Sequence, residues 1–201
     1  MRLLHLGDLE LTLPLALAAG GWLLAARAWR AAFAWALLYG GAMALVGGSK
    51  VAYLGWGADI GTLGFKAFSG HAAGVTAVYP VLGYLLCRQI GRGWALAMAG
   101  AGLALGLLVS FALVTNDEHA VAEAATGWLL GACASVGTLY QAEFRATPRG
   151  VAPGPASAAC AVAVFLASAA LMQSAHVNYW MIRIALALSG NAYPYSWDTC
   201  G

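Results

Sequence analysis

Six long apolar runs dominate this chain and restrict the folds open to it. They lie near residues 10–27, 31–49, 70–87, 94–114, 119–140 and 156–175. About 20 apolar residues in a helix cross the roughly 30 Å hydrocarbon layer of a bilayer, where only helices and closed barrels satisfy all their backbone groups. The sequence therefore predicts an all-α, polytopic membrane helical bundle with six transmembrane helices.

The composition agrees with this fold class. Of the 201 residues, 62% are hydrophobic and 9% are charged, and the mean hydropathy is +0.75. A chain of this kind cannot hide its apolar surface in one soluble core. The net charge of +2 is too small for a nucleic-acid surface, which neutralises many phosphates. We therefore expect a single integral membrane domain over residues 1–201, surrounded by membrane lipids, with no nucleic-acid partner and an oligomeric state that the sequence leaves open.

The charged residues lie mostly in the connectors between the runs. Because successive spans alternate in direction, the connectors fall into two sets. One set holds six of the ten Lys and Arg residues, which are Arg27, Arg30, Arg88, Arg92, Arg145 and Arg149. By the positive-inside rule this set marks the cytoplasmic face. The other set carries almost all the acids and the histidines, so we expect an inner (plasma) membrane protein whose polar cluster faces the periplasm or exterior.

The C-terminal segment, about 177–201, follows the sixth run. Its aromatic residues are typical of an interfacial belt, and they are Tyr179, Trp180, Tyr193, Tyr195 and Trp197. Residues 181–188 are predicted to form a short helix that lies in the headgroup plane.

A polar motif, Phe68-Ser69-Gly70-His71, stands at the start of the third run. It places a hydroxyl, a backbone amide without a side chain and an imidazole at a helix N-terminus, where unpaired N–H groups and the helix dipole favour an anion. Lys50, at the end of the second run, reaches the same face. The sequence therefore predicts a site for a phosphate-like anion here.

A second polar pair begins the fifth run. His119 and Glu123 are four residues apart, so on a helix they share a face and can hydrogen-bond. A carboxylate behind an imidazole fixes the tautomer and raises the basicity of the ring, as in hydrolase triads. The third and fifth runs enter the membrane from the same face, and ionisable residues at that depth are costly enough to indicate function.

With these residues the chain resembles the type 2 phosphatidic acid phosphatase superfamily. The signature of that superfamily is a lysine-bearing first motif, a Pro-Ser-Gly-His second motif, and a third motif of Ser-Arg, five residues, His, three residues and Asp. The matching residues are Lys50, Ser69, Gly70, His71, His119 and Glu123. The resemblance covers about residues 45–135, and it implies a phosphatase-like core there.

The resemblance implies a membrane lipid phosphatase that needs no metal and no other cofactor. His119 would attack phosphorus to give a phosphohistidine, Glu123 would orient His119, and His71 would protonate the leaving oxygen. The substrate would be a lipid phosphomonoester or a (poly)prenyl diphosphate. The groups that would hold the phosphoryl oxygens are Lys50, Ser69 and the Gly70 amide.

Arginine is missing at two positions of the signature, where this chain has Gly57 and Leu113. Guanidinium groups hold phosphate oxygens in a bidentate way that few other side chains match. We expect Lys66 or Arg183, which lie on the same face, to replace part of this function. The remaining differences from the signature are Ala58, Phe68 and Glu123.

Two other interpretations stay open. In a metal-dependent membrane hydrolase, His71, His119 and Glu123 would be ligands, since two histidines and one carboxylate also suit zinc. In a non-catalytic descendant, the same fold would bind or carry a lipid phosphate. The substrate also stays open, because phosphatidate, phosphatidylglycerol phosphate, undecaprenyl diphosphate, lipid A phosphate and a sphingoid phosphate present the same phosphoryl target.

Overall fold

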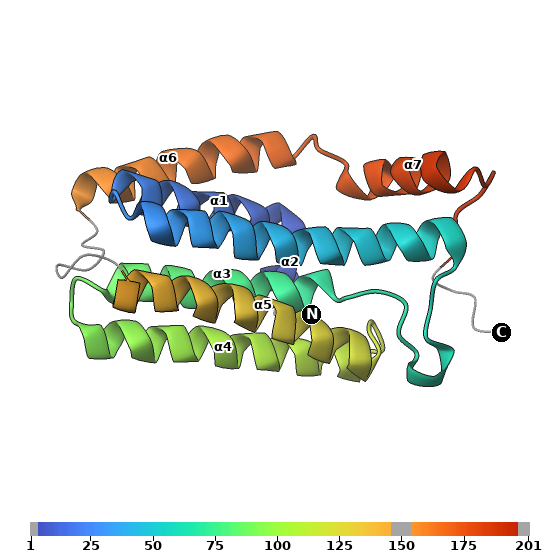
Figure 1. Ribbon diagram of the computed structural model, residues 1–201, viewed down its shortest axis with the longest axis horizontal. Helices are drawn as coiled ribbons and strands as arrows, with labels where there is room; N and C mark the ends of the chain where they lie inside the picture. Colours follow the sequence, from blue (N-terminus) through green and yellow to red (C-terminus); the bar gives the residue numbers. More distant parts are fainter. Residues whose placement is uncertain (1–3, 146–153, 197–201) are drawn as a thin grey trace.

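Helices make up most of the chain that the computed structural model describes, which is residues 4–145 and 154–196. They run nearly parallel along the long axis of the molecule (Figure 1). In chain order they are η1 (Leu4–Gly7), α1 (Leu9–Ala25), α2 (Trp29–Trp56), η2 (Gly61–Leu63), α3 (Gly70–Cys87), α4 (Arg92–Thr115), α5 (Val121–Tyr140), the π-helical η3 (Gln141–Arg145), α6 (Pro155–Met172) and α7 (Val177–Ser189).

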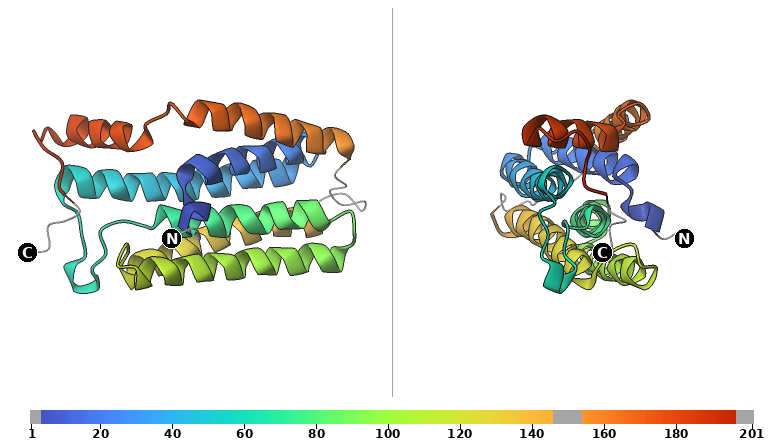
Figure 2. Two further views of the ribbon diagram at one scale, coloured as in Figure 1. Left: turned by 180° about the vertical axis from the view of Figure 1, so that it is seen from behind. Right: turned by 90° about the vertical axis from the view of Figure 1, so that its right-hand side faces the viewer.

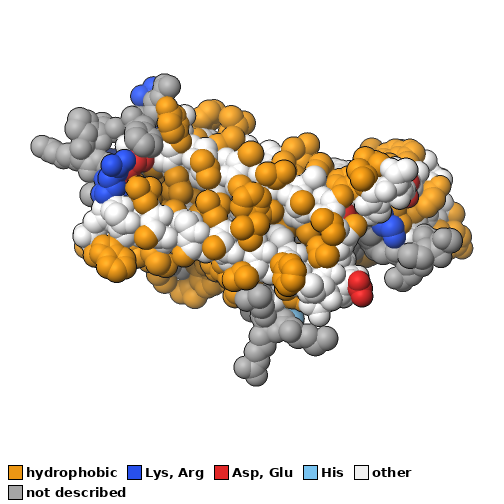
Figure 3. Space-filling view, turned by 90° about the horizontal axis from the view of Figure 1, so that it is seen from below, with side chains coloured by type: hydrophobic (Ala, Val, Ile, Leu, Met, Phe, Trp, Pro, Cys, Tyr) orange, Lys and Arg blue, Asp and Glu red, His pale blue; other side chains and the backbone are white. Residues whose placement is uncertain are grey.

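Each of the apolar runs is a helix, so the all-helical prediction is confirmed. Among the described residues, four helices are long and apolar enough to cross a membrane, namely α2, α3, α4 and α6. α1 is a shorter apolar helix of 17 residues, and α5, with 20 residues, is not one of the four. Hydrophobic side chains cover the face seen in Figure 3, and the charged groups visible there gather toward the two ends. The structure thus supports association with a membrane.

One predicted boundary is wrong. The second helix does not end at Lys50 but continues to Trp56, so Lys50 lies inside α2. No proline interrupts the apolar stretch after Lys50, and Gly55 within it remains helical. The helix ends only at Gly57, whose φ of +66° is a left-handed conformation that glycine adopts without strain.

α3 occupies the centre of the bundle and packs against α1, α2, α4 and α5, as the end-on view in Figure 2 shows. Two glycines of α5 bring that helix directly against the backbone of α3. A Cβ at Gly127 would lie 2.5 Å from the carbonyl oxygen of Ser69, and one at Gly131 would lie 2.5 Å from that of Ala73. Small residues allow such close contact between helices, and here the contact sets the start of α5 beside the start of α3.

The connectors gather at the two ends of the bundle, because successive helices alternate in direction. The α1–α2 and α3–α4 connectors and the end of α5 lie at one end, and the segments 57–69 and 116–120 lie at the other (Figure 1). Of the basic set predicted from the sequence, Arg149 lies outside the described residues.

α7 does not lie across the bundle. It follows α6 and runs beside the distal half of α2 (Figure 1). The segment after α7 binds the end of α2, because the Asn191 side chain donates to the Gly55 carbonyl at 2.7 Å and the Tyr195 amide donates to the Leu54 carbonyl at 3.0 Å. α7, which covers Val177–Ser189, is longer than the helix predicted over 181–188. Of the predicted aromatic residues, Tyr179, Trp180, Tyr193 and Tyr195 are exposed, and Trp197 lies outside the described residues.

A polar cluster at the arginine-bearing end joins three elements. Glu143 of η3, beyond the apolar run of α5, accepts hydrogen bonds from the Tyr84 hydroxyl of α3 and from Arg92 of α4. Arg88 donates to the Tyr84 hydroxyl at 3.1 Å. Burial of the Glu143 carboxylate opposes its ionisation, but the hydrogen bonds from Tyr84 and Arg92 and the nearby guanidinium charges outweigh this effect and lower the pKa of Glu143.

We predict that Glu143→Gln destabilises the protein at neutral pH by about 1–3 kcal/mol, because charged hydrogen bonds of a group that is only 8% exposed are lost. Since the folded-state pKa is depressed, the stabilisation is present above the ordinary pKa of glutamate and is lost as the pH falls through the folded value. The melting temperature of the detergent-solubilised protein should therefore differ between wild type and variant at pH 7 and converge at acidic pH. Glu10→Gln, the same change at an exposed glutamate, is the control. A difference that persists unchanged at low pH would contradict the ionic contribution.

Candidate functional site

A cavity of about 810 Å³ opens where α2, α5 and α7 meet at the end of the bundle opposite the arginines. Its polar and charged lining residues are Lys50, Lys66, Asp117, Glu118, His119, Glu123 and Asn178. Leu54 of α2 and Met181 and Ile182 of α7 form an apolar wall, and Gly64 and Ala120 complete the lining. The cavity therefore combines a cluster of ionisable groups with an apolar wall.

His119 and Glu123 form the central pair of this cavity. His119 Nδ1 lies 2.7 Å from Glu123 Oε2, and the side chains are 18% and 6% exposed. Within the described part of the chain, the other ring nitrogen, Nε2, has no hydrogen bond. The contact predicted from the spacing is present, and it leaves one imidazole nitrogen open for chemistry.

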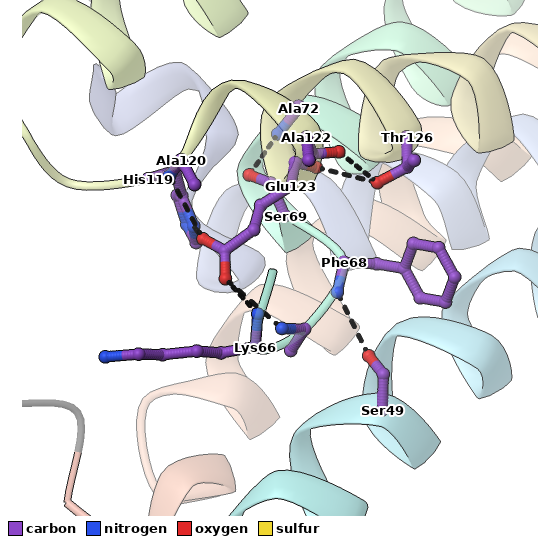
Figure 4. Close-up of polar contacts among 11 residues, drawn as sticks. Ser49, Lys66, Phe68, Ser69, Ala72, His119, Ala120, Ala122, Glu123 and Thr126 are labelled. Carbon is purple, nitrogen blue, oxygen red and sulfur yellow. Dashed lines mark hydrogen bonds and ion pairs between the residues drawn. The ribbon is translucent and has the colours of Figure 1, made fainter. Parts of the chain in front are cut away.

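The Glu123 carboxylate also organises the segment that precedes α3 (Figure 4). Its Oε1 accepts hydrogen bonds from the backbone amides of Lys66 at 2.8 Å and Ala67 at 3.2 Å. Its Oε2 accepts, besides the His119 contact, the Ala120 amide at 3.3 Å. The carboxylate thus fixes the imidazole, the start of α5 and the approach to α3 at the same time.

Two further contacts hold the Ser69 region. The Ser69 amide donates to the Glu123 carbonyl at 3.2 Å, and the Phe68 amide donates to the Ser49 hydroxyl of α2 at 3.1 Å. Ser69 is fully buried, and its hydroxyl accepts the Ala72 amide at 3.4 Å, which caps the N-terminus of α3. Ser69 is therefore not among the residues that line the cavity.

Two lysines supply positive charge to the cavity. Lys66 comes from the segment before α3, and its ammonium lies 5.7 Å from the centre of the Tyr53 ring. Lys50 comes from α2 and lies beside the first residue of α3, since a Cβ at Gly70 would be 3.8 Å from its Nζ. The carboxylates that line the same cavity are Asp117, Glu118 and Glu123. The lining thus carries both positive and negative groups, so the cavity is not a purely cationic site for anions.

Four predicted site residues lie outside the cavity lining, namely Ser69, Gly70, His71 and Arg183. His71 directs its Nε2 to Asp8 Oδ1 at 3.1 Å, and Arg183 stacks over the Tyr179 ring at 5.9 Å. The structure brings Lys50, Lys66, His119 and Glu123 together, with Gly70 beside Lys50.

The position of the missing third-motif arginine belongs to the core. Leu113, near the end of α4, is fully buried. Its carbonyl accepts the amides of Glu118 at 3.0 Å and His119 at 3.3 Å, which fixes the turn that leads into α5. This residue therefore supports His119 through the backbone and contributes nothing to charge in the cavity.

Several neighbours of the candidate residues were not anticipated from the sequence. Ser49, directly before Lys50, had a detectable signal, since a hydroxyl beside a lysine is unusual in an apolar run. Asp8 and the cavity residues of α7 had none, because only the folded chain brings them to the ends of α3 and α5.

Comparison with known proteins finds an uncharacterized bacterial relative and no matching family model. No family model matches the chain, and no solved structure matches it. The chain is 33% identical over 133 residues to a protein of Klebsiella pneumoniae described as an uncharacterized 22.5 kDa protein in the cps region. The match covers 66% of this chain and 64% of the relative, so the chain spans less than two thirds of that protein's length.

The metal-dependent interpretation has no ligand set in the described ranges, 4–145 and 154–196. No group of three or more His, Cys, Asp or Glu side chains there is placed to hold a metal ion. His71, which that interpretation needs beside His119, bonds Asp8.

We predict that Glu123→Asp releases the segment 57–69, because a side chain shorter by one methylene cannot reach His119 and the Lys66 and Ala67 amides together. A hydrogen bond to a charged group is worth about 1.5–3 kcal/mol, so local protection should fall by roughly 10- to 100-fold. Hydrogen exchange of peptides from this segment, followed by mass spectrometry in detergent, measures the change. Glu118→Asp is the matched control, since Glu118 is exposed and lines the same cavity. Equal protection in wild type and Glu123→Asp would show that the carboxylate does not hold the segment.

Proposed function

We propose that this protein is a membrane lipid phosphatase that hydrolyses a lipid phosphomonoester or a (poly)prenyl diphosphate through a phosphohistidine intermediate. The observation that carries the proposal is the His119–Glu123 pair at 2.7 Å, with Nε2 of His119 open in a cavity that it shares with Lys50 and Lys66. A carboxylate-backed imidazole is a nucleophile of the kind that two-step phosphoryl transfer requires. The resemblance to type 2 phosphatidic acid phosphatases rests on the same residues.

The proposed reaction has two displacements. In the first, His119 Nε2 forms a bond to phosphorus while the bond from phosphorus to the leaving oxygen breaks, and His71 gives a proton to that oxygen. In the second, water attacks phosphorus, the nitrogen–phosphorus bond breaks, and the proton of the water goes to His71. Lys50 and Lys66 would stabilise the charge on the equatorial oxygens, as cations do in other phosphoryl-transfer sites. Gly70 and Ser69 would contribute backbone and capping groups rather than a hydroxyl in the cavity.

The shape of the cavity supports an amphiphilic substrate. The phosphate would lie against the ionisable groups, and the apolar part would lie against Leu54, Met181 and Ile182. The exposed aromatic side chains of α7 suit the membrane–water boundary. In this proposal the six apolar helices span the inner membrane, and the cavity opens to the extracytoplasmic leaflet.

A second candidate function is lipid-phosphate binding without hydrolysis. It is favoured by the position of His71, which bonds Asp8 and does not line the cavity, and by the absence of both signature arginines. Such a protein would hold the phosphate with Lys50 and Lys66 and would not use His119 as a nucleophile.

We predict that His119→Ala abolishes phosphate release, by at least about a thousand-fold, because the nucleophile is lost. The assay is phosphate release from a panel of lipid phosphates and diphosphates by the purified protein, with and without vanadate and EDTA. Inhibition by vanadate and indifference to EDTA are expected. His176→Ala is the control, since His176 is exposed and is not among the residues that line the cavity.

Other outcomes separate the alternatives. Lipid-phosphate binding that survives His119→Ala, with no release from any lipid by the wild type, would favour the binding function. Release that is abolished by EDTA and insensitive to vanadate would favour a metal-dependent hydrolase.

The proposed orientation is tested with single cysteines in a variant whose natural cysteines are serines. Leu63→Cys lies in the segment beside the cavity, and Ile90→Cys lies in the α3–α4 connector; both positions are well exposed. A membrane-impermeant thiol reagent applied to intact spheroplasts should label position 63 and leave position 90 unlabelled until the membrane is opened. The reverse pattern would place the cavity on the cytoplasmic side.

A further inference from the structure

A second imidazole–carboxylate contact lies outside the cavity lining. The Asp8 carboxylate bridges two histidines, with Oδ1 3.1 Å from His71 Nε2 and Oδ2 3.0 Å from His5 Nδ1. The side chains of Asp8 and His71 are 40% and 33% exposed, whereas that of His5 is 74% exposed. The contact to His71 joins the start of α1 to the first turn of α3, although the two residues are far apart in the sequence.

The backbone around Asp8 is held firmly against α3. The Asp8 carbonyl accepts the amides of Leu11 at 3.0 Å and Thr12 at 2.9 Å, and the Thr12 hydroxyl at 3.0 Å. The Tyr79 hydroxyl of α3 donates to the Leu6 carbonyl at 3.3 Å. The preceding residue, Gly7, packs so closely that a Cβ there would lie 2.8 Å from the Cβ of His71. The carboxylate is therefore presented to the imidazole by packing as well as by its own hydrogen bond.

The contact determines which nitrogen of His71 is open. Nε2 is engaged by Asp8, and Nδ1 has no hydrogen bond within residues 4–145 and 154–196. In His119 the assignment is reversed, since Nδ1 bonds Glu123 and Nε2 is open. The two histidines thus each have one ring nitrogen held by a carboxylate and the other available.

We propose that Asp8 is a positioning residue, which holds Nε2 of His71 so that His71 transfers protons through Nδ1. This inference rests on the proposed function. As the bond from phosphorus to the leaving oxygen breaks and His119 Nε2 bonds to phosphorus, the Nδ1 proton of His71 passes to the leaving oxygen. When water attacks the phosphohistidine, its proton returns to Nδ1 and the nitrogen–phosphorus bond breaks. Asp8 itself gains and loses no proton in either step.

The test compares substrates whose leaving groups differ in their need for a proton. An alkoxide leaves poorly without protonation, whereas 4-nitrophenolate leaves well without it. Asp8→Asn keeps a residue that suits the start of a helix but removes the charge. We expect kcat for the lipid phosphomonoester that the wild type hydrolyses fastest to fall by about 100-fold, the lower range for lost acid–base catalysis. For 4-nitrophenyl phosphate, kcat should fall by less than about 3-fold.

Two variants complete the test. His5→Gln removes the exposed partner of Asp8, and it should behave as the wild type on both substrates. His71→Gln should show the same difference between substrates as Asp8→Asn. The double variant, with both Asp8→Asn and His71→Gln, should have the same kcat as His71→Gln alone, because the effects of residues that act through one another are not additive.

The tautomer of His71 gives a readout that does not depend on turnover. In ¹⁵N spectra of the labelled protein, assigned with His71→Gln, the neutral ring should carry its proton on Nε2 in the wild type. The proton should be shared between both nitrogens in Asp8→Asn. A tautomer that does not change would overturn the positioning role.

The outcomes separate this inference from the proposed function. If the wild type is active, equal losses of kcat in Asp8→Asn on both substrates, or no loss on either, would overturn the role of Asp8. The proposed phosphatase function would then stand. Release from diphosphates alone would also overturn it, since a leaving phosphate needs no proton from His71. A wild type that releases phosphate from no substrate would overturn the proposed function, and the catalytic role of Asp8 with it.

Discussion

The Glu123 carboxylate is the contact on which the cavity depends. It accepts hydrogen bonds from His119 and from three backbone amides, those of Lys66, Ala67 and Ala120. A buried carboxylate is stable only when its lone pairs are used, so the geometry of the imidazole and the path of the segment before α3 are set together. The extra methylene of glutamate, compared with the aspartate of the resembling superfamily, provides the reach for both tasks.

Much of the architecture could be predicted from the sequence, because apolar runs of sufficient length have few alternatives to being helices. The parity of those helices placed Lys50, Lys66 and His119 at one end of the bundle, and the four-residue spacing predicted the contact of His119 with Glu123. These inferences depend only on helix geometry and chain direction, and both can be read along a sequence.

The rest could not be predicted, since it depends on which faces of the helices meet. His71 begins α3 at the expected end of the bundle, but its side chain meets Asp8 at the start of α1, which no periodicity connects to it. Arg183 lies on α7, but Asn178, Met181 and Ile182 are the residues of that helix that reach the cavity. Lys50 lies within α2 because the apolar stretch after it contains no proline and stays helical, Gly55 included, until Gly57. Helix rotation and close packing decide these details, and both are tertiary properties.

The α7 wall has a consequence for the order in which the cavity is assembled. Met181 and Ile182 are translated well after His119 and Glu123, and α7 is held on α2 by contacts from residues as late as Asn191 and Tyr195. During synthesis, the ionisable groups would therefore come together before the apolar side of the cavity exists. A nascent chain that has folded only α1 to α5 would carry the paired imidazole and carboxylate on a solvent-accessible surface. The cavity would acquire its apolar boundary only when the last helix docks.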